Sequence, residues 1–155
     1  MRSRSRRWAA MGVGIVVVIA MAACGDDGEG GGDQGGASVD VTLQEFAVGA
    51  VPSTIDAGEV TFDVSNEGPD DVHEFVVIAT DLGPTELPTN EDGTVDEEGE
   101  GIEIIGEIEE VAVGSTESLT LDLDPGDYVL ICNIWEEDEQ ESHYQEGMRT
   151  SFTVN

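Results

Sequence analysis

The sequence YVLICNIWEEDEQESHYQEGMR (residues 128–149) contains one of the two cysteines of the chain, Cys132, one of its two histidines, His143, and the last of its four methionines, Met148. It opens on an almost wholly apolar run, which is typical of a buried strand. The alternating residues 148–154 predict another strand directly after it. Three soft or borderline metal ligands therefore lie between two predicted strands, in a chain otherwise rich in carboxylates.

Alternating apolar and polar residues predict further strands at residues 39–46, 58–68 and 115–123. Residues 73–79, HEFVVIA, are apolar on both faces, as expected of a central strand. Turn signals separate these short strands, and no long amphipathic helix is predicted. The sequence therefore predicts an all-β fold, a Greek-key antiparallel β-sandwich.

An acidic insertion interrupts this pattern. Residues 81–110 carry 12 acidic side chains among 30 positions, together with Pro84 and Pro88. We expect a solvent-exposed acidic loop here. Residues 102–111, at its C-terminal end, are compatible with either a short strand or one or two helical turns.

The second histidine, His73, begins the apolar strand 73–79, so both histidines, Cys132 and Met148 fall at strand ends. Two imidazoles and a thiolate with a weak axial thioether form the donor set of a blue (type 1) copper site. Zinc could use the same side chains, but structural zinc sites favour other sets. Each residue taken alone is also compatible with a core or surface position.

Two of these motifs carry a family resemblance. GDYVLIC followed by HYQEGM resembles the C-terminal signature of the plastocyanin/azurin (cupredoxin) family, and HEFVVI resembles the strand that supplies the first histidine of that family. The resemblance implies a cupredoxin-like domain over residues 38–155. It also implies one copper ion, held by four ligands: His73, Cys132, His143 and Met148.

In that family the protein is a one-electron carrier and not an enzyme, and its loop histidine lies near the surface as the electron port, here His143. The chain departs from the family at two points. Ten residues separate Cys132 from His143, where the family has far fewer, and Glu74 stands where an asparagine often follows the first histidine. Trp135, inside the insertion, is expected to pack on the domain, with a role in electron transfer left open.

The N-terminal segment reads as an export signal. Four arginines within the first seven residues precede an uncharged apolar run of 16 residues, 8–23, which is too short to span a membrane and typical of a signal peptide. The run ends in MAAC, which resembles a bacterial lipobox and implies a signal peptide over residues 1–23 and lipidation of Cys24. An ordinary secretory signal and a twin-arginine signal are the alternatives.

A glycine-rich tether follows over residues 24–37, so the resemblance implies a protein anchored by lipid at the extracytoplasmic face of the cell membrane. If Cys24 is lipidated, Cys132 has no disulfide partner and needs another role. A disulfide between Cys24 and Cys132 is the alternative.

The charge limits the partners. The chain carries a formal charge of −30, and beyond residue 7 its one basic residue is Arg149. Such a surface repels nucleic acid and favours a basic redox partner or a high-salt habitat. Together with this charge, the two resemblances imply a monomeric, extracytoplasmic one-electron carrier. A copper storage or delivery protein and a cell-surface binding sandwich with a vestigial site are the alternatives.

Overall fold

The computed structural model describes residues 36–155. The predicted signal peptide (residues 1–23), the lipidation site Cys24 and almost all of the tether lie outside the described residues. Within residues 36–155, no helix is long and apolar enough to cross a membrane.

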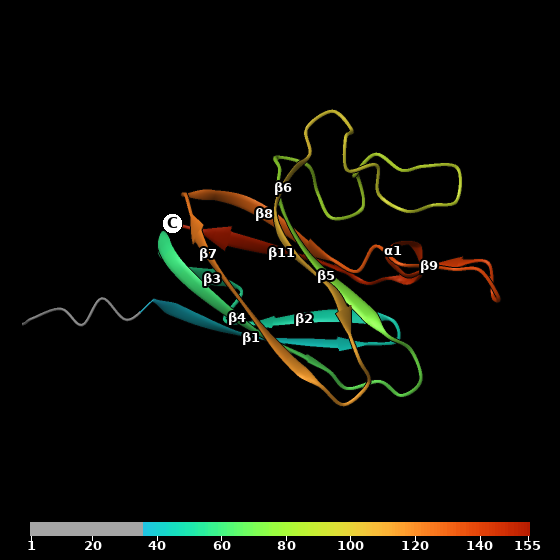
Figure 1. The fold of residues 1–155 in the computed structure, drawn as a ribbon. Helices are drawn as coiled ribbons and strands as arrows, with labels where there is room; N and C mark the ends of the chain where they lie inside the picture. The colour runs from blue at the N-terminus through green and yellow to red at the C-terminus, as the bar shows by residue number, and fades with distance from the viewer. Residues whose placement is uncertain (1–35) are drawn as a thin grey trace, which may run out of the picture. The chain divides into compact units, whose positions relative to one another are not determined.

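Two β-sheets form a sandwich (Figure 1). The four-stranded sheet has the order β2 (Ala47–Val51), β1 (Ala37–Gln44), β4 (Gly58–Asn66) and β7 (Thr116–Leu123). The five-stranded sheet has the order β3 (Thr54–Ile55), β11 (Arg149–Val154), β8 (Gly126–Ile131), β5 (His73–Ala79) and β6 (Glu103–Val111). The predicted all-β sandwich is confirmed, and all but the first of the undecided residues 102–111 belong to strand β6.

The sheets are mixed, whereas the sequence analysis expected antiparallel pairing throughout. β1 pairs parallel with β4, and β11 pairs parallel with β3, while the other pairs are antiparallel. β2 carries the chain back to the start of β1, so β4 then runs beside β1 in the same direction. Alternation along a strand is the same for both kinds of pairing, and therefore the sequence pattern did not distinguish them.

The main core lies between the sheets. Inward-facing apolar side chains of β1 and β4 meet those of β5, β8 and β11. The ring of Phe62 lies 5.4 Å from that of Phe75 and 5.5 Å from that of Phe152, measured between centroids, so aromatic side chains of both sheets interlock. Burial of such side chains is the dominant stabilising contribution to a fold of this kind.

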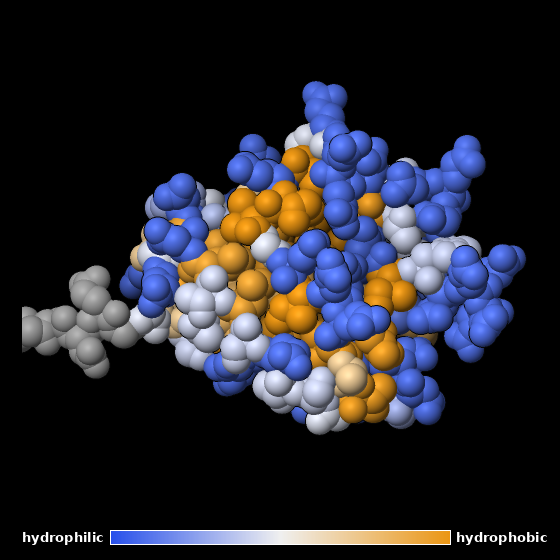
Figure 2. All heavy atoms as spheres, in the orientation of Figure 1, coloured by the Kyte–Doolittle hydropathy of each residue, from blue (hydrophilic) through white to orange (hydrophobic). Residues whose placement is uncertain are grey.

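A second core lies on the outer face of the five-stranded sheet. Outward-facing residues of β5 and β8 pack against Leu87 and Val95 of the acidic segment, which we define as residues 81–101 between β5 and β6. Most carboxylates of the segment are exposed, and hydrophilic side chains dominate this part of the surface in Figure 2. The expected acidic loop is therefore also a packed cover, which explains why β5 and β8 are apolar on both faces.

Candidate metal centre

Sheet register brings His73 and Cys132 together. In the β5–β8 ladder Val76 pairs with Ile131, so the residues just beyond the ladder, His73 on one strand and Cys132 on the other, lie at the same end of the sheet. The backbone N–H of Glu74 donates to Sγ of Cys132 at 3.2 Å. Cys132 is a free thiol, and both it and His73 are fully buried.

The insertion before His143 forms a small β-hairpin, which the sequence analysis did not foresee. β9 (Trp135–Glu136) pairs antiparallel with β10 (Glu141–Ser142). Directly after β10, the N–H of His143 donates to the carbonyl oxygen of Ile134 at 3.0 Å. The hairpin therefore returns the chain to within two residues of Cys132, and the ten-residue spacing does not separate the two ligands in space.

One helical turn connects His143 to Met148. α1 (His143–Glu146) is capped at its start by the side chain of Ser142, which accepts from the N–H of Gln145. Gly147 ends the turn with φ of 133°, and a Cβ there would lie 3.0 Å from the carbonyl oxygen of Phe46, so this position requires glycine.

Met148 lies beside Cys132 in the backbone ladder. The β8–β11 register continues to this pair, and the N–H of Cys132 donates to the carbonyl oxygen of Met148 at 3.1 Å. Both side chains are fully buried in the same hydrophobic cluster. The role of the Met148 thioether as an axial ligand stays a prediction.

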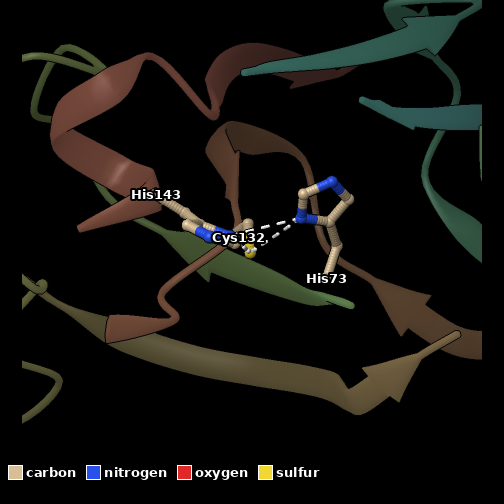
Figure 3. A group of neighbouring side chains, drawn as sticks. All are labelled: His73, Cys132 and His143. Carbon is tan, nitrogen blue, oxygen red and sulfur yellow. Dashed lines mark hydrogen bonds between the residues drawn. The ribbon is translucent and has the colours of Figure 1, made fainter. Parts of the chain in front are cut away.

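The donor atoms of His73, Cys132 and His143 converge (Figure 3). The two Nδ1 atoms lie 3.2 Å apart, and Sγ of Cys132 lies 3.3 Å from Nδ1 of His143 and 4.0 Å from Nδ1 of His73. Bonds to imidazole nitrogen and thiolate sulfur measure roughly 2.1 and 2.3 Å in zinc sites, so donors on one such ion lie within about 4.4 Å of each other. All three separations satisfy this limit, and the set of two imidazoles and one thiolate fits one type 1 copper ion.

Burial controls the protonation of these groups. It lowers the pKa of both imidazoles, and the neighbouring charge of His143 lowers that of His73 further. Burial raises the pKa of the Cys132 thiol to about 12. The imidazoles are therefore ready to donate at neutral pH, whereas a metal ion must displace the thiol proton in order to bind.

The acidic segment holds the ligand loop, residues 133–148, through side-chain hydrogen bonds. Asn133, directly after Cys132, accepts from the N–H of Val95 at 2.6 Å and donates to its carbonyl oxygen at 3.2 Å. Ser142, directly before His143, donates to the carbonyl oxygen of Gly93 at 2.9 Å. The residues that flank two of the three donors are thus fixed to one segment.

Glu74 connects the two strand ends. Its carboxylate accepts from the N–H of Asn133 at 3.2 Å. The residue that departs from the family pattern therefore still links the His73 strand to the residue that follows Cys132. Burial and the charge of Glu97 raise the pKa of Glu74 to about 7.

The resemblance predicts His143 near the surface, and the structure shows its side chain covered rather than exposed. Its side chain is fully buried, and the partly exposed ring of Phe46 lies against it with 5.4 Å between ring centroids. Phe46 and Glu45 form the turn between β1 and β2, which we call the capping turn, and Glu45 lies beside His73. Sequence reasoning missed the capping turn because it precedes His73 by 27 residues and shows only strand-like alternation.

Comparisons with known proteins agree with this geometry at the level of the fold. No protein-family model matches the chain, and neither does any curated protein. The reduced auracyanin of Roseiflexus castenholzii is 21% identical with a TM-score of 0.51, and the match covers 77% of this chain and 99% of that one. Auracyanin A of Chloroflexus aurantiacus, described as a "blue" copper protein, is 18% identical with a TM-score of 0.53 over 78% and 100%. Reduced rusticyanin is 19% identical with a TM-score of 0.53 over 77% and 81%. The described domain therefore has the cupredoxin-like β-sandwich fold.

Proposed function

We propose that the protein is a one-electron carrier with a type 1 copper site, in which His73, Cys132 and His143 are the main ligands and Met148 is the axial donor. The observation that carries the proposal is the convergence of two imidazole Nδ1 atoms and one thiol sulfur, brought from a strand start, a strand end and a loop, in a fully buried cluster. The cupredoxin-like fold supports it.

When bound, copper supplies a centre that changes its charge by one unit. The residues of the chain hold their donor atoms in a fixed arrangement. This donor set combines the soft sulfur ligand that Cu(I) favours with the imidazole ligands that Cu(II) accepts, so it suits both oxidation states. A frame anchored by two ladders and a helical turn has little freedom to rearrange when an electron moves. Complete burial of Cys132 also keeps water and oxidants away from the thiolate.

Catalysis is not expected of this site. Four protein ligands leave no position at which a substrate could bind the metal, and the three converging donors are inaccessible to solvent. Electrons would have to reach the site through the side chains that separate it from solvent. We propose that they pass at the partly exposed ring of Phe46, which lies against His143.

The location and partners follow from the sequence of residues 1–37 and from the charge. We propose a monomer anchored through a lipidated Cys24 at the extracytoplasmic face of the cell membrane. Its redox partner would present a basic surface, because acidic residues outnumber basic ones 35 to 5 in the chain and Arg149 is the one basic residue of the domain.

The test is to load the purified protein with one equivalent of Cu(II) and to measure two rates. A carrier exchanges electrons rapidly between oxidised and reduced copies, as measured by NMR line broadening, and releases copper slowly to an external chelator. A storage or delivery protein shows the opposite, with rapid release and slow exchange. Failure to retain copper at all would favour the binding sandwich with a vestigial site.

A further inference from the structure

Glu45 is a largely buried acidic residue with no lysine or arginine partner among the residues that the structure describes. Its side chain lies in the capping turn and is only 11% exposed, although glutamate is rarely buried unless it is paired. The domain has a single basic residue, Arg149, and this side chain binds the carbonyl oxygens of Tyr144 and Gln145 instead. A carboxylate in this setting must be stabilised by hydrogen-bond donors.

Two backbone N–H groups donate to one oxygen of Glu45, and an imidazole nitrogen of His73 lies close to the same oxygen. Oε1 accepts from the N–H of Asp71 at 2.7 Å and from that of Asp70 at 3.1 Å, and it faces Nε2 of His73 at 3.6 Å. Two backbone N–H groups donating to the same carboxylate oxygen stabilise the ionised form of Glu45. The capping turn therefore holds a negative charge against the imidazole edge that points away from the metal cluster.

The tautomer of His73 follows from this arrangement. Nδ1 faces the other donor atoms, so it must carry no proton if it is to bind a metal ion. The proton of the neutral ring then lies on Nε2, which is fully buried and has no hydrogen-bond partner among the described residues; Oε1 of Glu45, at 3.6 Å, is the acceptor that it faces. A carboxylate on the far nitrogen of a ligating histidine fixes the ring and its tautomer in many metal sites.

His143 provides an internal contrast. Its Nε2 is also fully buried and without a hydrogen-bond partner among residues 36–155, but its ring packs against Phe46 instead of a carboxylate. The two imidazoles thus have equal burial, but a carboxylate oxygen contacts the Nε2 of His73 alone, whereas Glu45 acts on His143 only from a longer range. An effect of Glu45 on the tautomer should therefore appear at His73 and not at His143.

We propose that Glu45 is a positioning residue of the metal centre: its carboxylate accepts the Nε2 proton of His73, directs Nδ1 toward the metal and adds a buried negative charge that favours Cu(II) over Cu(I). The inference rests on the proposed copper site for its effect on the metal, whereas its effect on the tautomer does not require copper. A negative charge one imidazole ring away from the site stabilises the more positive oxidation state, so it lowers the reduction potential.

The experiment compares Glu45→Gln and Glu45→Ala with the wild type. Glu67→Gln is the matched control, since it removes the same formal charge from an exposed side chain in the connection between β4 and β5. Imidazole nitrogen-15 NMR of the metal-free protein at pH 8 reports the tautomer, and voltammetry of the copper-loaded protein reports the potential. Glutamine keeps an acceptor oxygen but no charge, and alanine keeps neither.

We expect the His73 ring to carry its proton on Nε2 in the wild type and in Glu45→Gln. In Glu45→Ala, a measurable fraction of His73 should carry the proton on Nδ1 instead, and the tautomer of His143 should not change. Both variants should have a higher reduction potential than Glu67→Gln. The proposal would be overturned if His73 of the wild type carried its proton on Nδ1. It would also be overturned if Glu45→Ala left the tautomer of His73 unchanged. A potential in Glu45→Gln equal to that of the control would overturn it as well. If the wild type binds no copper, the proposed function fails, and the metal-free spectra still decide the role of Glu45.

Discussion

His73 and His143 are both fully buried, but the regions that hold them are built differently. His73 lies at the start of β5 in the five-stranded sheet, where the β5–β8 ladder and the hydrogen bond from the N–H of Glu74 to Sγ of Cys132 place it beside Cys132. His143 lies in the ligand loop, residues 133–148, and is held by a hairpin, one helical turn and contacts with the acidic segment.

The difference shows what each ligand depends on. A residue inside a sheet shares its support with the whole core, so few single substitutions should move it. A residue in a loop depends on a small number of specific contacts, and loops owe their position to such contacts more than to regular structure. Disturbing the acidic segment should therefore affect the His143 side of the site and leave the His73 side intact.

The largest effect is expected from Leu87→Ala. Leu87 is buried under the acidic segment, and removing a buried leucine side chain costs about 2–4 kcal/mol of unfolding free energy. Denaturant unfolding measures the loss, and hydrogen exchange should rise at the amides of Gly147 and Met148 more than within β5. Val51→Ala is the control, because Val51 is 70% exposed and its loss should cost less than about 0.5 kcal/mol. Equal costs for the two variants would contradict the packed role of the segment.

Asn133→Ala should have the next largest effect. It leaves the N–H of Val95, itself 1% exposed, without its acceptor, and an unsatisfied buried donor costs about 1–3 kcal/mol. Thermal or denaturant unfolding measures the change. Asn90→Ala is the matched control, since Asn90 bonds within the acidic segment to Thr94 and does not reach the ligand loop. A larger loss from the control would mean that the segment does not hold the loop through Asn133.

Phe46→Ala should uncover His143 without altering the position of His73. We expect copper to pass to an external chelator about tenfold faster, in line with the usual effect of losing a supporting residue around a metal site. Phe46→Leu keeps an apolar cover and should release copper at nearly the wild-type rate. If alanine and wild type release copper at the same rate, the capping turn does not limit access to the site.

Met148→Leu should have the smallest effect on stability, less than about 1.5 kcal/mol, because the two side chains have similar volume. Copper should still bind and stay blue, and the reduction potential should rise because Cu(II) loses a weak axial donor. Voltammetry and copper analysis measure the outcome. Loss of copper or a lowered potential would show that Met148 is not the axial ligand proposed.

Strands and metal donors were predictable because their signals are local. Apolar alternation located β1, β4, β7 and β11, and the run HEFVVIA coincides with β5. The scarcity of histidine and cysteine made His73, Cys132 and His143 stand out, and the structure brings all three together. His73 and Cys132 lie at the ends of strands that the same patterns predicted, whereas His143 begins α1.

What could not be predicted depends on contacts between distant parts of the chain. The acidic segment reads as a solvated loop, because Leu87 and Val95 are isolated apolar residues with no periodic pattern. The capping turn carries no metal-site signal at all, since the environment of Glu45 is created by Asp70, Asp71 and His73. The direction of strand pairing and the burial of His143 are tertiary properties of the same kind.

The most direct test of the central claim is the visible absorption spectrum after addition of one equivalent of Cu(II), recorded for the wild type and for Cys132→Ser. If Cys132, His73 and His143 bind one copper ion, the wild type turns intensely blue through the thiolate–copper bond, and the serine variant loses this band. A serine variant that matches the wild type in spectrum and copper content would show that the thiolate is not a ligand, and the account of the site would be wrong.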